Sequence, residues 1–515
     1  MPDYPPARRE DVIKTVGGVS YPDPYAWLHE DSEEALAYGW AQNAIAEQIA
    51  KNSPRYEAVK AEVLHWQENG SFLDAPRLKG GWWFWTDEGN ERQRTIALVR
   101  NKDGGEPRII ADTISLAAGR TGGEESRLMY LDPSPQGRFA ALFFADATLA
   151  NGEWRVVETA TGRLLPVALP AFALGNRPGW LPNESGFFVA ARTPEGGNLL
   201  RFVPVTDEAE AFEDLAISDD LLPEHIPSFT PQVSPDGRRV VLSSEPHERI
   251  AMVLVDLVSR ETRAFLPAGW PNECDGAWLD PETYVARITG DAPRGRVVAI
   301  PVATSQDAGS WRELVAEGEG AMRFAGLCAG RLVVADLVDT SVRFRTFDAD
   351  GSNEREVPLE AMGSSPASEF QRTLRSTDAL AIMHQTFFRS IATYVYDFDS
   401  GALSEFSPPK HRLNGIHVEQ RFATSKDGTR IPYSIVRRDG PRQGPQPTWS
   451  TAMVVTISRW CRAFSATSFR SSRREASMSA PHCAAAVNMA VTGMKLANSR
   501  TSIRCSRICS RSRRI

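Results

Sequence analysis

The sequence predicts a mainly β fold, a seven-bladed β-propeller that follows an N-terminal helical segment and precedes the first strands of a further domain. Between about Leu78 and Gln420, seven strand-like apolar runs begin at intervals of 44 to 57 residues. Most runs follow a Pro- or Gly-containing turn, and further short strands come after each of them. Several strands per unit at this period are typical of a propeller, whose closed ring protects strand edges. A large β-sandwich, the alternative, would not need so even a period.

The N-terminal segment, residues 1–71, is predicted to form helices after an extended arm. The motif D-P-Y-A-W-L (23–28) comes before Asp31, and Asp31 with Glu34 has the form of a capping box. A second helix is predicted over residues 56–66. The first helix carries an apolar stripe that must pack on something. The stripe consists of Leu36, Trp40, Ala41, Ala44, Ile45 and Ile49.

Each propeller unit, within residues 72–420, is predicted to bury one apolar run. The first run, W-W-F-W at 82–85, could instead form a stacking platform for a ligand. Alternate residues of a blade strand face two sheet layers, however, which favours core packing for these aromatic side chains. The seven runs begin at Trp82, Phe139, Phe187, Val240, Tyr284, Leu332 and Leu380.

Residues 421–448 are predicted to begin a different domain. Strands on either side of K-D-G-T (426–429) should form a hairpin, because Asp-Gly supplies the positive φ of a tight turn. Residues 441–447, which are rich in Pro, Gly and Gln, predict a surface loop before another strand.

Composition excludes several classes of protein. The chain has 515 residues and a net charge of −7, and it contains no run of about 18 apolar residues and no secretory signal. We therefore expect a soluble, cytoplasmic protein with no membrane partner. Cys274 and Cys328 lie far apart in predicted strands and are interpreted as buried thiols. The histidines before the tail have no serine or carboxylate partner marked by spacing, and structural or exposed roles are predicted for His29, His65, His225, His247, His384, His411 and His417.

In combination these features resemble the prolyl oligopeptidase family of serine peptidases, in which a propeller caps an α/β-hydrolase domain. The resemblance spans residues 4–448 and rests on D-P-Y-A-W-L, the propeller and S-K-D-G-T-R-I-P (425–432), in that order. It implies that the protein hydrolyses short peptides after proline through an acyl-enzyme, as a monomer and without a cofactor. It also implies that the N-terminal helices pack on the hydrolase domain and that the propeller admits only short peptides.

The catalytic residues of that family are not found. After residue 448 the family continues with a tyrosine- and glycine-rich loop, a G-x-S-x-G elbow, and a catalytic Asp and His. The chain contains no G-x-S-x-G and no Asp after position 448, and His482 is its only histidine after His417. Nucleophilic catalysis needs a hydroxyl activated by an imidazole that a carboxylate orients. We therefore predict no catalytic, cofactor-binding or metal site, and no peptidase activity as translated.

The tail, residues 449–515, has a different composition from the body. It contains eleven Arg, one Lys and thirteen Ser against one Glu, a net charge of +11, whereas residues 1–448 carry −18. If each residue is instead read from the third base of its codon and the first two bases of the next, residues 449–455 permit V-Y-G-Y-G-G. Residues 483–495 permit R-G-G-G-E-Y-G, two further residues and W-H-E. Both strings resemble the start of the family's hydrolase domain, so we infer a frameshift close to codon 448 and expect a disordered tail.

Other interpretations of the tail and of the whole chain are weaker. Its Arg-Ser dipeptides could bind RNA through charge alone, but we expect no nucleic-acid partner. Cysteine and histidine side chains in the tail could bind a metal, but their spacing matches no zinc pattern. Those residues are Cys461, Cys483, Cys505, Cys509 and His482. For the whole chain, the alternative function is a propeller that binds a partner without catalysis.

Overall fold

The structure is a computed structural model, and it divides into two compact units between residues 70 and 71. It describes residues 4–16, 18–29, 32–68, 75–88, 95–113, 127–145, 152–171, 177–192, 197–206, 212–221, 229–244, 252–360, 362–365, 375–440, 448–450 and 477–481. Among these residues, no helix combines the length and the apolar character needed to cross a membrane.

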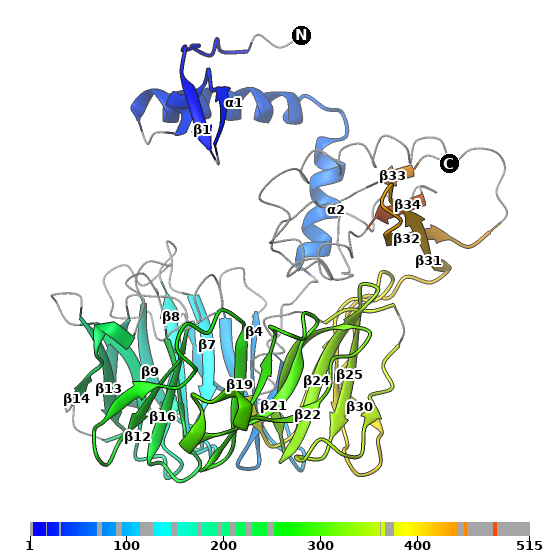
Figure 1. The fold of residues 1–515 in the computed structure, drawn as a ribbon. Coiled ribbons are helices and arrows are strands. Elements are labelled where there is room, and N and C mark those ends of the chain that lie inside the picture. Colours follow the sequence, from blue (N-terminus) through cyan, green and yellow to red (C-terminus); the bar gives the residue numbers. More distant parts are fainter. Residues whose placement is uncertain are drawn as a thin grey trace. The chain divides into compact units, whose positions relative to one another are not determined.

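The N-terminal unit contains a hairpin, a short 3-10 helix and two α-helices (Figure 1). Its elements are β1 (Ile13–Val16), β2 (Val19–Pro22), η1 (Ala26–His29), α1 (Glu33–Lys51) and α2 (Tyr56–Glu68). The predicted cap at Asp31 is wrong by one residue. Ser32 has the extended backbone of an N-cap, and its hydroxyl oxygen accepts a hydrogen bond from the Ala35 N–H at 3.2 Å. Glu34 is therefore one residue too early to complete a capping box, and it pairs with Arg8 instead.

Trp27, from the motif D-P-Y-A-W-L, is the buried centre of this unit. Its indole N–H donates to the Arg8 carbonyl at 2.8 Å, and its ring meets the Tyr38 ring edge-on at a centroid distance of 5.5 Å. The Arg8 guanidinium lies over the same indole at 5.3 Å. The motif thus ties the extended arm to α1, because an aromatic ring supplies apolar area and one polar anchor together.

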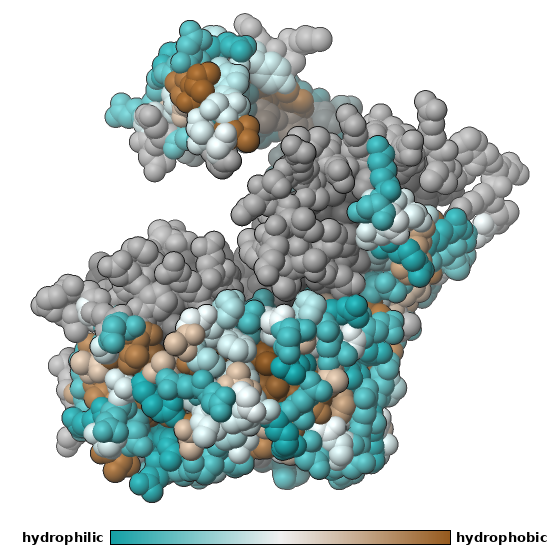
Figure 2. Space-filling view, in the orientation of Figure 1, coloured by the Kyte–Doolittle hydropathy of each residue, from teal (hydrophilic) through white to brown (hydrophobic). Residues whose placement is uncertain are grey.

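The apolar stripe predicted on α1 remains exposed within this unit. Leu36, Trp40 and Ile49 are 56%, 72% and 49% exposed, and no described residue of α1 is buried. Figure 2 shows apolar surface on the helical N-terminal unit. Apolar area of this kind is expensive to leave in water and commonly marks an interaction surface.

The propeller is built from consecutive antiparallel sheets, one for each blade (Figure 1). Blade 1 consists of β3 (Arg77–Lys79), β4 (Trp82–Glu88), β5 (Thr95–Asn101) and β6 (Arg108–Asp112). Blade 2 consists of β7 (Arg127–Pro133), β8 (Phe139–Ala145), β9 (Gly152–Glu158) and β10 (Leu164–Ala171). Blade 3 consists of β11 (Gly179–Trp180), β12 (Gly186–Arg192), β13 (Asn198–Pro204) and β14 (Glu213–Ala216). Blades 4 and 5 are β15 (Phe229–Val233), β16 (Arg239–Ser244), β17 (Met252–Asp256) and β18 (Thr262–Ala264); and β19 (Cys274–Asp280), β20 (Thr283–Ile288), β21 (Arg296–Pro301) and β22 (Arg312–Val315).

Blades 6 and 7 complete the ring and confirm the predicted count. They are β23 (Ala321–Cys328), β24 (Arg331–Val338), β25 (Ser341–Phe347) and β26 (Arg355–Glu356); and β28 (Leu380–His384), β29 (Ala392–Tyr396) and β30 (Leu403–Ser407). The short strand β27 (Arg375–Thr377) precedes blade 7 and pairs in parallel with β23. Short 3-10 helices lie at η3 (Asp219–Leu221), η4 (Val302–Thr304) and η5 (Ala308–Ser310).

Apolar clusters join the blades to one another. Among the described residues, seven clusters of buried side chains occur, one at each junction between neighbouring blades around the ring. The predicted aromatic run belongs to two of them: Phe84 packs toward blade 2, whereas Trp83 and Trp85 pack toward blade 7. The core interpretation of W-W-F-W is therefore confirmed, since these three side chains are at most 8% exposed.

Blades 7 and 1 close the ring without exchanging a strand. Each blade consists of strands that are contiguous in sequence, and the junction holds four buried residues where every other cluster has at least seven. The Asp378 N–H donates to the Leu78 carbonyl at 3.0 Å, and the Gly80 N–H donates to Asp378 Oδ2 at 3.0 Å. The Phe406 ring packs against the rings of Trp83 and Trp85 at centroid distances of 5.1 and 5.6 Å. The seam is therefore held by packing and by a few hydrogen bonds.

A separate sheet follows the propeller. Its strands are β31 (Ile416–Thr424), β32 (Arg430–Arg438), β33 (Thr448–Ser450) and β34 (Ser477–Pro481), in the order β31-β32-β34-β33. The predicted hairpin at K-D-G-T is confirmed, because β31 and β32 pair across this turn and Gly428 has φ +86°. The remaining residues of the tail, for which disorder is predicted, lie outside the described residues.

Candidate functional site

The first strands of five blades, together with β27, line a cavity of about 430 Å³. Its wall includes Arg77 and Lys79 of β3, Asp132 of β7, Trp180 of β11 and Trp278 of β19. A cavity of this size could hold a small molecule or part of a peptide, and mixed apolar and charged walls are usual for binding sites. This cavity is the candidate site of the described part of the chain.

Basic side chains outnumber acidic ones on the cavity wall. Arg77 Nη1 lies 2.7 Å from Asp132 Oδ1 in a pair that is almost fully buried. Lys79 Nζ lies 3.8 Å from Asp378 Oδ1, too far for a hydrogen bond. Burial lowers the pKa of Lys79, and the charge of Asp378 opposes this effect. Arg177 is a third cation on the wall, against the single lining carboxylate of Asp132.

Two tryptophans give the wall apolar area and polar N–H groups. The Trp278 indole N–H donates to the Gln232 carbonyl at 2.9 Å, which links blade 5 to blade 4. The Trp180 side chain is buried, and its Nε1 has no hydrogen-bond partner among the described residues. An unpaired buried donor is costly, so an acceptor that reached Trp180 Nε1 from the cavity would stabilise the protein.

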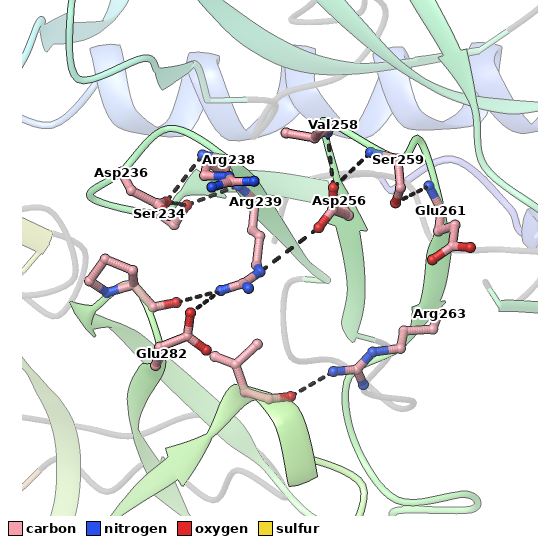
Figure 3. Close-up of polar contacts among 12 residues, drawn as sticks. Ser234, Asp236, Arg238, Arg239, Asp256, Val258, Ser259, Glu261, Arg263 and Glu282 are labelled. Atoms are coloured by element: carbon pink, nitrogen blue, oxygen red, sulfur yellow. Dashed lines mark hydrogen bonds and ion pairs between the residues drawn. The ribbon is translucent and has the colours of Figure 1, made fainter.

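Two turns beside the cavity have nearly the same sequence but form different hydrogen bonds. In S-P-D-G (234–237), Asp236 Oδ1 accepts from Ser234 Oγ at 2.6 Å and from the Arg238 N–H at 3.1 Å (Figure 3). In S-P-Q-G (134–137), Gln136 stands at the position of this Asp and has no carboxylate that could accept the same hydrogen bonds.

Glu184 of the neighbouring blade supplies the missing carboxylate to the second turn. Its Oε1 accepts from Ser134 Oγ, from the Gln136 N–H at 2.7 Å and from the Arg138 N–H at 3.4 Å. The Glu184 side chain is fully buried, and its backbone has φ +59°. Blade 3 therefore completes a turn of blade 2.

An arginine network links blade 4 to blade 5 (Figure 3). Arg239 Nη1 donates to the Pro281 carbonyl at 2.9 Å and to Glu282 Oε1 at 2.8 Å, and Arg263 Nη2 donates to the Val302 carbonyl at 2.6 Å. The hydrogen bond to Glu282 is the main cause of a raised pKa for Arg239. Since both guanidinium groups bind protein acceptors, we interpret the network as structural.

His384 is the buried histidine of blade 7 and the most perturbed titratable group of that blade. Arg389 Nη2 donates to His384 Nδ1 at 2.8 Å, so the neutral ring carries its proton on Nε2. Arg389 also donates to the Tyr394 hydroxyl at 2.7 Å and pairs with Glu360 at 3.0 Å. Burial, and secondarily the charge of Arg389, lower the His384 pKa to about 4.

Acidification is expected to destabilise the propeller through His384. The folded protein keeps this ring neutral down to about pH 4, whereas the unfolded chain protonates it below about 6.5, so stability is lost as the pH falls between these values. The loss attributable to His384 should reach about 2 kcal/mol at pH 5 relative to pH 7.5. Urea denaturation at both pH values measures it.

The variant that tests the cause is His384→Gln. It should remove about 2 kcal/mol of the pH dependence, whatever its own stability. An unchanged slope in His384→Gln would show that the ring does not carry the effect.

The structure places the other predicted residues as follows. Cys274 and Cys328 are buried free thiols, as predicted, and burial raises the pKa of each to about 12. Neither can act as a nucleophile near neutral pH. No group of three metal-ligating side chains occurs in the described ranges. The side chains of His65, His225 and His247 lie outside the described residues, as do the cysteine and histidine side chains of the tail, for which no metal site is predicted.

Sequence reasoning missed the cavity and its charged wall, since the residues concerned are scattered over six segments. It also missed Glu184. The one available signal was that one S-P-x-G turn has Asp where the other has Gln. This difference shows that the second turn needs a carboxylate from elsewhere, but not which residue provides it.

The fold and the cavity define a propeller-domain protein, and comparison with known proteins gives the family. The family model described as "Prolyl oligopeptidase, N-terminal beta-propeller domain" matches residues 4–408. The chain therefore belongs to the prolyl oligopeptidase family.

The similar proteins are longer than this chain. A prolyl endopeptidase of Elizabethkingia miricola is 22% identical over 466 residues, which cover 86% of this chain and 63% of the relative. A prolyl endopeptidase of Elizabethkingia meningoseptica is 21% identical over the same coverage. The chain thus spans less than two thirds of the length of these curated relatives.

Solved structures agree on the fold. One from a study of two prolyl endopeptidases superposes with a TM-score of 0.75 at 20% identity and covers 93% of this chain and 71% of its own. Prolyl oligopeptidase B of Galerina marginata, bound to a 35-residue hydrolysis and macrocyclization substrate, superposes with a TM-score of 0.74 at 15% identity, and covers 93% of this chain and 71% of its own.

Proposed function

We propose that this chain derives from a serine endopeptidase of the prolyl oligopeptidase type, which cleaves short peptides after proline, and that the 515 residues as translated have no peptidase activity. The family match at residues 4–408 supports the descent. The absence of G-x-S-x-G from the sequence, and of any Asp after position 448, supports the loss of activity, because neither the elbow nor the orienting carboxylate can form.

The observation that carries this proposal is the pair of family strings in one alternative reading frame. Several positions allow little choice: Met453 followed by Val454 must give Gly, and Val487 followed by Asn488 must end in A-A. The degeneracy of the genetic code permits both V-Y-G-Y-G-G and R-G-G-G-E-Y-G with W-H-E in the same frame. We infer that residues 449–515 are the out-of-frame translation of a hydrolase segment.

The exposed face of α1 supports the same proposal. In an intact enzyme of this type, the hydrolase domain would cover Leu36, Trp40 and Ile49, which are 56%, 72% and 49% exposed here. Without that domain the uncovered face favours aggregation or degradation of the chain. We also propose short proline-containing peptides as substrates of the intact enzyme, and a monomeric, cytoplasmic state.

Sequencing the gene around codon 448 tests the proposal directly. The expected result is that one added base, or two removed, opens a continuous frame in which both strings are followed by G-x-S-x-G, Asp and His. A frame interrupted by stop codons soon after codon 495, with no elbow, would contradict the frameshift.

A second candidate is a propeller retained for binding, which the cavity of about 430 Å³ favours. It predicts that the translated chain accumulates as a folded protein and retains a specific ligand through purification. Rapid degradation in cells, together with the absence of any such ligand, would count against it.

A further inference from the structure

We propose that the propeller cavity is an anion site that takes an oxyanion or a carboxylate, with Lys79 and the Trp180 N–H as its binding groups. The site consists of propeller residues alone, so it does not rest on the proposed peptidase function. It can be tested on the chain as translated.

The charge of the wall is the first step. Arg77, Lys79 and Arg177 line the cavity together with one carboxylate, Asp132. Arg77 and Asp132 neutralise each other at 2.7 Å. The lining itself thus has more cations than carboxylates, and Asp378, which is not part of the lining, lies 3.8 Å from Lys79. In a partly enclosed space, low dielectric strengthens the attraction of an anion to such a wall.

The incomplete bonding of Lys79 is the second step. Its side chain is only 14% exposed, yet its ammonium group makes no hydrogen bond to another described residue. The nearest carboxylate oxygen, Asp378 Oδ1, is 3.8 Å away, while Asp378 Oδ2 accepts from the Gly80 N–H. A buried ammonium group has three donors to satisfy, and an anion in the cavity would satisfy them better than Asp378 does.

Trp180 is the independent second observation. Its Nε1 is buried and lacks a hydrogen-bond partner among the described residues, whereas Nε1 of Trp278, which lines the same cavity, donates to the Gln232 carbonyl. A donor without an acceptor and an ammonium group without a hydrogen bond, both on residues that line one cavity, point to an acceptor-rich, negatively charged ligand. A free inorganic oxyanion and the terminal carboxylate of a short peptide share this chemistry.

Isothermal titration of the 515-residue chain with sodium sulfate, at constant ionic strength set with chloride, tests the site. We expect saturable binding at one site, weakened at least tenfold by Lys79→Met. Lys102→Met is the matched control, because Lys102 is exposed in a turn and does not line the cavity, and it should bind as the wild type does. Lys79→Arg keeps the charge and should stay within about threefold.

Trp180→Phe is the second variant, for the case that Lys79→Met does not fold. It keeps an aromatic ring, removes the N–H donor and should weaken sulfate binding about three- to tenfold.

Two further ligands identify the source of the bound anion: a blocked tripeptide with a free carboxyl terminus, and the same tripeptide as its C-terminal amide. Lys79-dependent binding of the acid but not the amide assigns a peptide carboxylate, and binding of sulfate alone assigns a free oxyanion. Binding of neither, or binding that is unchanged in both variants, overturns the proposal.

Discussion

Inserting one base between codons 448 and 449 of the gene is expected to convert an inactive polypeptide into an endopeptidase that cleaves after proline. The insertion joins the propeller and the S-K-D-G-T-R-I-P hairpin to the frame that permits V-Y-G-Y-G-G and R-G-G-G-E-Y-G. Because loss of a serine-protease triad removes about 10⁶ in kcat, the gain over the translated chain should be at least about 10⁴-fold. Turnover of a chromogenic proline peptide by the two purified proteins measures it.

Two matched controls separate a restored triad from a contaminant or a general folding effect. A three-base insertion at the same place keeps the original frame and should leave the chain inactive. Replacing the serine of the restored G-x-S-x-G by alanine should return the one-base product to background. Ordinary turnover of the chromogenic proline peptide by the 515-residue chain itself would contradict the proposed loss of activity.

Glu184→Ala is expected to destabilise the propeller by about 3 kcal/mol, although the residue lies outside every predicted strand run. The change leaves the buried Ser134 hydroxyl and the partly buried Gln136 N–H without their charged acceptor, and hydrogen bonds to charged groups are costly to lose at such a position. The shift of the urea midpoint, at an unchanged dependence on urea concentration, measures the loss.

Gln136→Asp tests the cause of that loss. Its effect on stability should have opposite signs in the Glu184→Ala protein and in the wild-type protein. In the Glu184→Ala protein it supplies a carboxylate in the position that Asp236 has in its own turn, so it should recover part of the lost stability. In the wild-type protein it places a second carboxylate beside the buried Glu184 and should destabilise. Equal effects in both backgrounds would show that the two turns are not equivalent.

The sequence predicted the propeller because each blade contains one strand whose apolar residues are contiguous. Six of the seven predicted runs are strands that pair with the first strand of their blade, for example β4 with β3 and β8 with β7, whereas the seventh run, β28, is itself the first strand of its sheet. The first strands of the other six blades could not be predicted. Some are only two or three residues long, such as β3 and β11, and they carry Arg, Lys and Gly instead of an apolar run.

The candidate site could not be predicted, because its residues are brought together by ring closure. Gly80 and Asp378 are 298 residues apart, yet their hydrogen bond fixes the turn next to Lys79. No local pattern reports such a pairing. A nucleophile elbow, in contrast, is a local motif that can be searched for in sequence alone, and the search finds no G-x-S-x-G in the 515 residues.

The contiguity of every blade has a consequence for chain connectivity. No blade borrows a strand from the opposite end of the chain, so a cut at a connection between blades leaves the sheets whole, provided that the cut between blades 6 and 7 comes after β27, which pairs with β23. If the present ends of the propeller, near Arg77 and Ser407, were joined by a linker, the order of the blades in the gene could be rotated without splitting a hydrogen-bonded sheet. Each blade is thus a possible starting point for the chain, and the junction between blades 7 and 1 differs from the others in its smaller apolar cluster and in that the chain enters and leaves the propeller there.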